Sequence, residues 1–152
     1  MKIYGKALKE YIWPIKYYVI GAILAVILQY YAAVPLSDKY ELPFILNITQ
    51  AAWALMVAFS VIKLTLFYDF NFKNVLVLGV LYSIIIHGLK AFVFRVFLFP
   101  YSDPAIEQYI FHLLNRFLYG SFLVMIIAII LGFLFIKLKN NPGIRKSFKL
   151  LK

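Results

Sequence analysis

The chain contains no cysteine and only six acidic residues among its 152 positions. The lack of cysteine excludes a disulfide framework, a thiol redox relay and a Cys-ligated metal or cluster. No Asp or Glu falls inside a long apolar run. Carboxylate-based ion coupling, aspartyl intramembrane proteolysis and metal-dependent phosphotransfer therefore lack the carboxylates that each requires.

Apolar residues, in contrast, make up 64% of the chain, and its mean hydropathy is +0.88. Soluble domains contain roughly 45–50% apolar residues. The apolar residues form four runs at about 17–35, 43–67, 74–94 and 117–136. Each run meets or approaches the roughly 20 residues that cross the hydrocarbon core of a bilayer. We therefore expect an all-α, multi-pass integral membrane protein, in the plasma membrane if the chain is prokaryotic, with a four-helix transmembrane bundle over residues 17–139.

The net charge of +10 is distributed unevenly between the two sides of this expected bundle. One side holds Glu10 and Asp69 together with Lys2, Lys6, Lys9, Lys16, Lys63, Lys73, Lys137, Lys139, Arg145, Lys146, Lys149 and Lys152. This side carries the whole excess of positive charge, and the other side is neutral. The positive-inside rule then predicts that both termini are cytoplasmic. We expect the basic ends to contact anionic lipid headgroups, and not nucleic acid.

Segments outside the four runs also have recognisable patterns. Apolar residues at positions 3, 4, 7, 8, 11 and 12 lie among lysines, which predicts an amphipathic helix over 2–13 within an interfacial segment, residues 1–16. Ser102-Asp103-Pro104 predicts the start of a last helix that is about 50 Å long and ends near Lys139. Residues 140–152 then form a basic cytoplasmic tail.

Small and polar residues recur at helical spacing in every run. They are Gly21, Ala25, Gln29 and Ala32; Asn47, Gln50, Ala54 and Ala58; Gly79, Ser83, His87 and Lys90; and Gln108, His112, Asn115, Arg116, Tyr119 and Gly120. Small residues let membrane helices approach closely and polar side chains link them. The four stripes are therefore expected to face one another. Most of their polar members fall in the half of the bundle away from the termini, which predicts a polar, cationic vestibule there.

Cationic residues in this half admit two interpretations. A charge at mid-membrane costs at least about 2.5–3.5 kcal/mol and so indicates function. One interpretation is a site for an anionic phosphate group, formed by Lys90, Arg95, His112, Arg116, Asn115, Gln50 and Asn47. The other is a structural clamp, in which Asp103 and Glu107 form ion pairs with these cations.

Two histidines, His87 and His112, lie in the same half on neighbouring runs. Such a pair can ligate a b-type haem. A third protein ligand for zinc is not evident, so no metal site is expected.

No motif places the chain in a known family, and the absence of catalytic motifs favours a protein that is not an enzyme. The leading hypothesis is a subunit, accessory protein or scaffold of a membrane complex, packed against a protein partner or a second copy of itself. The alternative is a transporter or flippase that binds an anionic lipid or lipid-linked substrate in the vestibule. A haem-bearing membrane anchor is the third hypothesis.

Overall fold

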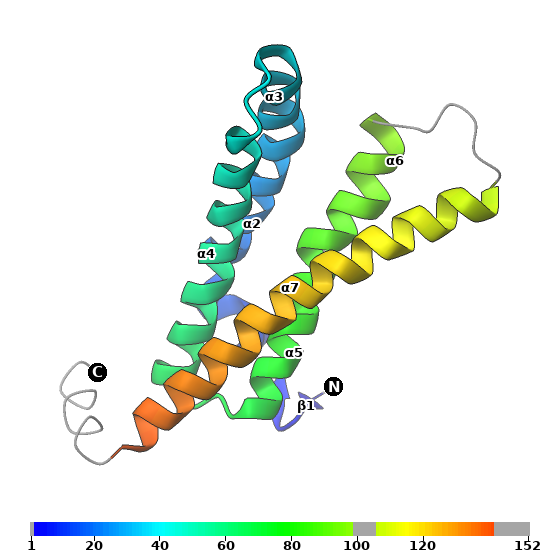
Figure 1. Cartoon of the computed structure of the whole chain (residues 1–152). Coiled ribbons are helices and arrows are strands. Elements are labelled where there is room, and N and C mark those ends of the chain that lie inside the picture. The colour runs from blue at the N-terminus through cyan, green and yellow to red at the C-terminus, as the bar shows by residue number, and fades with distance from the viewer. Residues whose placement is uncertain (1, 99–105, 142–152) are drawn as a thin grey trace.

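The computed structural model describes residues 2–98 and 106–141, and this part of the chain is mostly helical (Figure 1). Four helices are long and apolar enough to cross a membrane: Leu8–Tyr40, Phe44–Phe67, Phe72–Leu98 and Glu107–Asn140. The four predicted membrane spans are thereby confirmed, by length and composition. The second helix matches its apolar run to within one residue, whereas the other three extend beyond the runs that predicted them.

The first span is built from five consecutive helical segments. These are α1 (Leu8–Ile12), the 3-10 helix η1 (Trp13–Ile15), α2 (Lys16–Leu28), the π-helix η2 (Gln29–Ala33) and α3 (Val34–Tyr40). Pro14 and Pro35 lie in the first turns of η1 and α3, at junctions where one helical segment follows another directly. Proline has no N–H group to donate to the preceding turn, so each proline interrupts the hydrogen-bond pattern of the span at its junction. The span ends at Glu41, whose backbone is left-handed with φ of 52°.

The second and third spans are joined by a short turn between Phe67 and Phe72. Helix α4 covers Phe44–Phe67, and the third span consists of α5 (Phe72–Ser83), the π-helix η3 (Ile84–Phe94) and α6 (Arg95–Leu98). The side chain of Asn71 caps α5 by accepting a hydrogen bond of 3.0 Å from the Asn74 N–H.

The last span is the single helix α7 (Ile106–Asn140), whose 35 residues extend about 52 Å. Its described part agrees with the predicted long last helix. The predicted cap at Ser102-Asp103-Pro104 and the tail from residue 142 onward lie outside the described residues.

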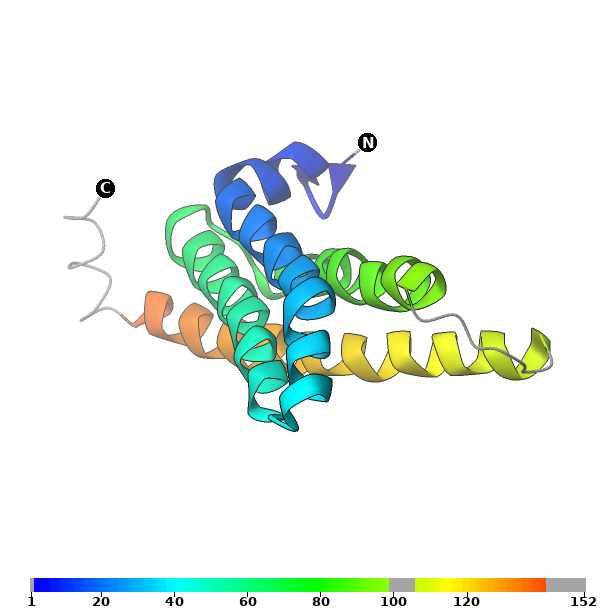
Figure 2. The ribbon, with the colours of Figure 1, turned by 90° about the horizontal axis from the view of Figure 1, so that it is seen from above.

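The helices form two arms that diverge from a common base. At the base, α7 crosses α4 and α5, and both ends of the described chain lie there (Figures 1 and 2). Away from the base, α2, η2, α3 and α4 form one arm, and η3 and α6 with the first half of α7 form the other. The core of the base is apolar and includes Val57, Val61, Leu64, Val75, Leu78, Ile86, Val124 and Ala128. A Cβ atom at Gly79 would lie 2.6 Å from the Met125 sulfur, so this glycine allows α5 and α7 to approach closely.

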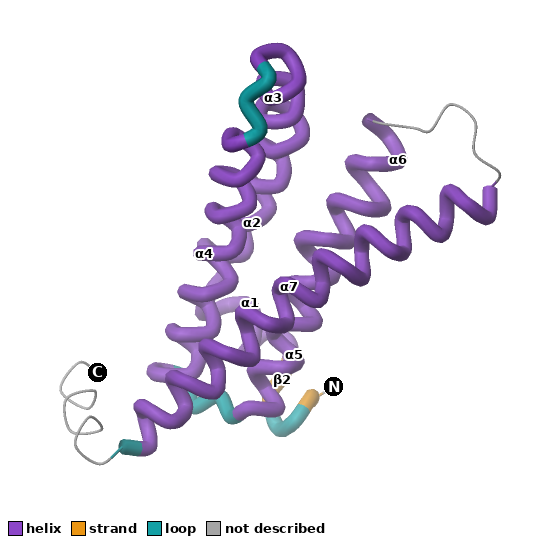
Figure 3. Tube along the Cα trace, in the orientation of Figure 1, coloured by secondary structure: helices purple, strands orange, loops and turns teal. Residues whose placement is uncertain are grey.

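The N-terminal segment differs from the predicted amphipathic helix over 2–13. Strand β1 (Lys2–Ile3) pairs antiparallel with β2 (Lys6–Ala7) in a short hairpin, and the helix begins only at Leu8 (Figure 3). The two turn residues, Tyr4 and Gly5, both have positive φ, of 46° and 84°. This is the backbone that two-residue hairpin turns require.

The side chain of Tyr11 holds the hairpin against the base. Tyr11 is fully buried, and its hydroxyl donates toward the Ile3 carbonyl oxygen at 2.9 Å and Asn74 Oδ1 at 2.8 Å. Its ring packs edge-on against Phe70. An amphipathic surface helix would have left Tyr11 at the bilayer, whereas the fold uses it as an internal anchor.

Candidate functional site

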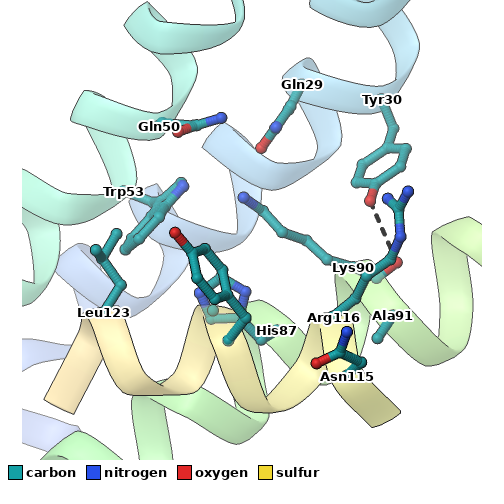
Figure 4. Close-up of a pocket in the computed structure, with 12 residues that line it drawn as sticks. Gln29, Tyr30, Gln50, Trp53, His87, Lys90, Ala91, Asn115, Arg116 and Leu123 are labelled. Carbon is teal, nitrogen blue, oxygen red and sulfur yellow. Dashed lines mark hydrogen bonds between the residues drawn. The ribbon is translucent and has the colours of Figure 1, made fainter. Parts of the chain in front are cut away.

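A cavity of about 450 Å³ lies where the two arms diverge (Figure 4). Its wall is formed by η2, α4, η3 and α7. The lining residues are Gln29, Tyr30, Gln50, Trp53, His87, Lys90, Ala91, Asn115, Arg116, Tyr119, Gly120 and Leu123. Every one of the four spans therefore contributes to this cavity.

Both π-helical segments border the cavity. Gln29 and Tyr30 belong to η2, and His87 and Lys90 belong to η3. The Tyr30 hydroxyl donates a hydrogen bond of 3.3 Å to the Lys90 carbonyl oxygen, which links the two segments directly. π-Helices are rare and occur frequently at functional sites. Their location here supports the assignment of the cavity as the candidate functional site.

Lys90 reaches into the centre of the cavity. Figure 4 shows its side chain pointing into the space between Gln29, Gln50 and Trp53. Its ammonium nitrogen lies 4.9 Å from the centre of the Trp53 ring, which is a cation–π contact. The Trp53 ring in turn meets the His87 ring edge-to-face, with 5.3 Å between ring centres. Lys90 is thus positioned by aromatic neighbours while its charge faces the cavity.

His87 occupies a tight position against α7. Its side chain is 7% exposed. A Cβ atom at Gly120 would lie only 2.0 Å from His87 Nδ1, so the ring fits because residue 120 has no side chain. The small residue predicted to allow close helix packing therefore makes room for a polar ring at the cavity wall.

Three buried polar atoms of the lining residues have no hydrogen-bond partner within the described part of the chain. They are Gln29 Oε1, Trp53 Nε1 and His87 Nε2, on side chains that are 9%, 2% and 7% exposed. A buried polar group without a partner costs about 1–3 kcal/mol. A bound ligand that supplied the missing partners would remove these costs.

The charge of the lining is positive. Lys90 and Arg116 are both cations, and no acidic residue is found among the twelve lining residues. Asn115 and Gln50 add amide groups that can donate hydrogen bonds. Charge-assisted hydrogen bonds from Lys and Arg are the strong contacts that hold phosphate and carboxylate groups. The cavity is therefore chemically suited to an anion.

The structure brings together part of the predicted anion site. Lys90, Arg116, Asn115 and Gln50 line the cavity, but Arg95, His112 and Asn47 do not. Arg95 is half-buried on α6, whereas His112 and Asn47 are exposed on α7 and α4. Of the predicted clamp, Glu107 is exposed at the start of α7 and Asp103 lies outside the described residues, so the clamp stays a prediction.

The two histidines of the haem hypothesis do not share the cavity wall. His87 lines the cavity and His112 does not. Among the described residues, no group of three or more His, Cys, Asp or Glu side chains could hold a metal ion. A b-type haem needs only two histidines, so the haem hypothesis stays a prediction.

Trp53, Tyr30, Tyr119 and Gln29 line the cavity but were not among the predicted anion-binding residues. Gln29 and Tyr119 had been predicted only as members of the polar stripes. Trp53 carried a usable signal, because Trp prefers the membrane interface and this one lies in the middle of a 24-residue span.

Comparison with known protein families, curated proteins and solved structures finds no match, so the chemistry of the cavity is the guide to function.

Proposed function

We propose that this protein binds the anionic headgroup of a membrane lipid or lipid-linked substrate in the cavity and acts as a transporter or flippase for it. The observation that carries the proposal is the pair of cations, Lys90 and Arg116, in a cavity wall without acidic residues. A charge at this depth is costly unless it is compensated. An anionic headgroup would provide that compensation.

A lipid is favoured over a soluble anion because the cavity adjoins the apolar outer surface of α7. Tyr119 lines the cavity and is 78% exposed, and its neighbours Leu118 and Phe122 are 62% and 65% exposed. In a bilayer these side chains would contact acyl chains. A lipid could therefore place its headgroup between the arms while its chains stay in the hydrocarbon.

The orientation of the cavity follows from the charge distribution. Lys6, Lys73 and Lys139 lie at the base, and the positive-inside rule assigns a basic side of this kind to the cytoplasm. The arms then extend toward the outer face. We propose that the cavity takes its lipid from the outer half of the bilayer.

The alternative, a subunit or scaffold of a membrane complex, has weaker support. In that case the small-residue pairs Gly21/Ala25 and Ala54/Ala58 are the candidate contact faces for a partner. A Cβ atom at Gly21 would lie 3.1 Å from the Met56 sulfur, and Ala25 is 7% exposed. The first of these faces thus packs inside the chain, which leaves it no surface for a partner.

Lipid retention in native mass spectrometry tests the proposal. The wild-type protein, Lys90→Gln and Arg116→Gln would each be incubated with phosphatidylglycerol or phosphatidylcholine. We expect the wild type to retain phosphatidylglycerol preferentially, and each variant to lose about tenfold in affinity, because a hydrogen bond to a charged group contributes about 1.5–3 kcal/mol.

Lys39→Gln is the matched control, because it removes the same charge from an exposed residue outside the cavity. It should bind phosphatidylglycerol as the wild type does. Equal retention of both lipids by the wild type, or unchanged binding by both cavity variants, would contradict the binding site. Transport itself is measured with fluorescent phosphatidylglycerol in proteoliposomes, and binding without transport would leave only a lipid-binding protein.

A further inference from the structure

Resting on the proposed function, we propose that the bound headgroup carries hydroxyl groups beside a phosphodiester, as a polyol or sugar phosphate does. The inference comes from the mixture of hydrogen-bond donors and acceptors in the cavity wall, of which Trp53 Nε1 and Gln29 Oε1 are buried and have no partner among the described residues. Lys90, Arg116 and the Trp53 N–H are donors, whereas Gln29 Oε1 is an acceptor. One ligand must therefore offer both acceptors and donors.

A phosphodiester alone meets only half of this requirement. Its unesterified oxygens accept hydrogen bonds from Lys90, Arg116 and Trp53, but it has no hydrogen to give to Gln29 Oε1. A hydroxyl group both donates and accepts. A headgroup with hydroxyls next to the phosphate would satisfy Gln29 and the cations together.

The amide side chains are arranged to meet such hydroxyls. Figure 4 shows the Gln29 and Gln50 side chains on opposite sides of the space into which Lys90 points. Asn115 adds a third amide to the lining, from α7. Each amide presents one acceptor oxygen and two donor hydrogens, whichever way its ends are assigned. This pattern matches a ring or chain that bears several hydroxyls.

The size and aromatic content of the cavity agree with a polyol headgroup. A volume of about 450 Å³ is far larger than a phosphate group needs and is in the usual range for small-molecule sites. The exposed ring of Tyr119 provides an apolar face at the cavity wall. Such a face can pack against the C–H groups of a sugar ring while the amides bind its hydroxyls.

Trp53 can report binding directly. The chain has two tryptophans, and Trp13 is 62% exposed in η1, so Trp13→Phe leaves Trp53 as the single reporter without disturbing the core. This variant, in nanodiscs of phosphatidylcholine, would be titrated with phosphatidylethanol, phosphatidylglycerol and phosphatidylinositol. Phosphatidylethanol is an anionic phosphodiester whose headgroup carries no hydroxyl. We expect the Trp53 fluorescence change to give the tightest Kd for phosphatidylinositol, about tenfold below that for phosphatidylethanol.

Adding Gln29→Met isolates the role of the hydroxyls. This change keeps the length of the side chain and removes its hydrogen bonds. The phosphatidylinositol Kd should therefore rise toward the phosphatidylethanol Kd, and the phosphatidylethanol Kd should not change. Gln108→Met is the control, because Gln108 is exposed on α7 outside the cavity.

The outcomes separate this inference from the proposed function. Equal Kd values for phosphatidylethanol and phosphatidylinositol would overturn the hydroxyl inference and leave the anion site intact. If no anionic lipid changed the Trp53 fluorescence, both the hydroxyl inference and the proposed function would fail. The ranking of lipids is measured with an unaltered cavity, so it does not depend on whether the Gln29 variant folds.

Discussion

The His87 ring occupies space on α7 that any side chain at residue 120 would fill. The ring packs between Trp53 and Gly120, and a Cβ atom at Gly120 would overlap three of its atoms at 2.0–2.6 Å. A methyl group there would force the ring out of its position. The His87 ring contacts Trp53, and the Trp53 ring contacts the Lys90 ammonium group. Displacement of the His87 ring would therefore also shift Trp53 and Lys90.

We predict that Gly120→Ala destabilises the protein by about 1–3 kcal/mol, the usual cost of overpacking, and weakens anionic-lipid binding. Gly88→Ala is the control, because Gly88 lies on the same π-helix and a Cβ atom there would meet nothing within 4 Å. That variant should be neutral or slightly stabilising. Thermal unfolding in detergent, followed by Trp fluorescence, measures both; equal melting temperatures for the two variants would contradict the packing described for His87.

The three residues that were predicted for the anion site but do not line the cavity lie farther along the arms. Arg95 begins α6, directly after η3 and five residues past Lys90. Asn47 and His112 each precede a lining residue, Gln50 and Asn115, by three positions, or about one helical turn. The prediction used charge and approximate depth, and these do not show at which helical turn the cavity ends.

At the scale of whole elements, the N-terminal hairpin and the α4–α5 turn stabilise each other. Lys6 Nζ donates a hydrogen bond of 3.1 Å to the Tyr68 carbonyl oxygen, and the Tyr11 hydroxyl reaches Asn74 at the start of α5. On the other side of the same turn, Lys139 forms an ion pair with Asp69 and donates to the Thr65 carbonyl oxygen. Both ends of the described chain are thus fastened to one turn.

We predict that Tyr11→Phe releases the hairpin, because it removes the hydroxyl and leaves the buried Asn74 Oδ1 without that partner, at a cost of about 1–3 kcal/mol. Limited trypsin digestion should then cleave at Lys2, Lys6 and Lys9 faster than in the wild type. Tyr17→Phe, at a residue that is 73% exposed, is the control and should digest at the wild-type rate. Unchanged cleavage of the Tyr11 variant would show that the hairpin is held by other contacts.

Elements could be predicted from the sequence where one strong physical signal dominated. The four spans followed from hydrophobic length, which few other arrangements satisfy. The hairpin was missed because its apolar spacing fits a surface helix equally well, and only burial of Tyr11 decides between them. The π-helices η2 and η3 were not predicted, because a long apolar run has no residue pattern that distinguishes π-helical from α-helical turns. The wider turns are visible only in the structure.

For the molecule as a whole, the side of the membrane that the cavity faces determines which lipids can reach it. The twelve Lys and Arg residues assigned to the base side, against two acidic residues, predict a cytoplasmic base. Exposed lysines are available at both ends, with Lys39 on α3 at the tip of one arm and Lys73 on α5 at the base. The absence of native cysteine means that a single introduced thiol can be labelled without background.

We therefore predict that, in intact cells, a membrane-impermeant maleimide labels the Lys39→Cys variant and labels Lys73→Cys only after permeabilisation. The substitution at residue 39 removes a positive charge from the arm side, and the one at residue 73 leaves eleven basic residues on the base side, so neither should reverse the charge bias. The reverse labelling pattern would put the cavity in the cytoplasmic half of the bilayer, where its lipid would have to come from the inner leaflet. Labelling of both variants in intact cells would indicate dual insertion, and a single outward-facing cavity would then no longer describe the protein.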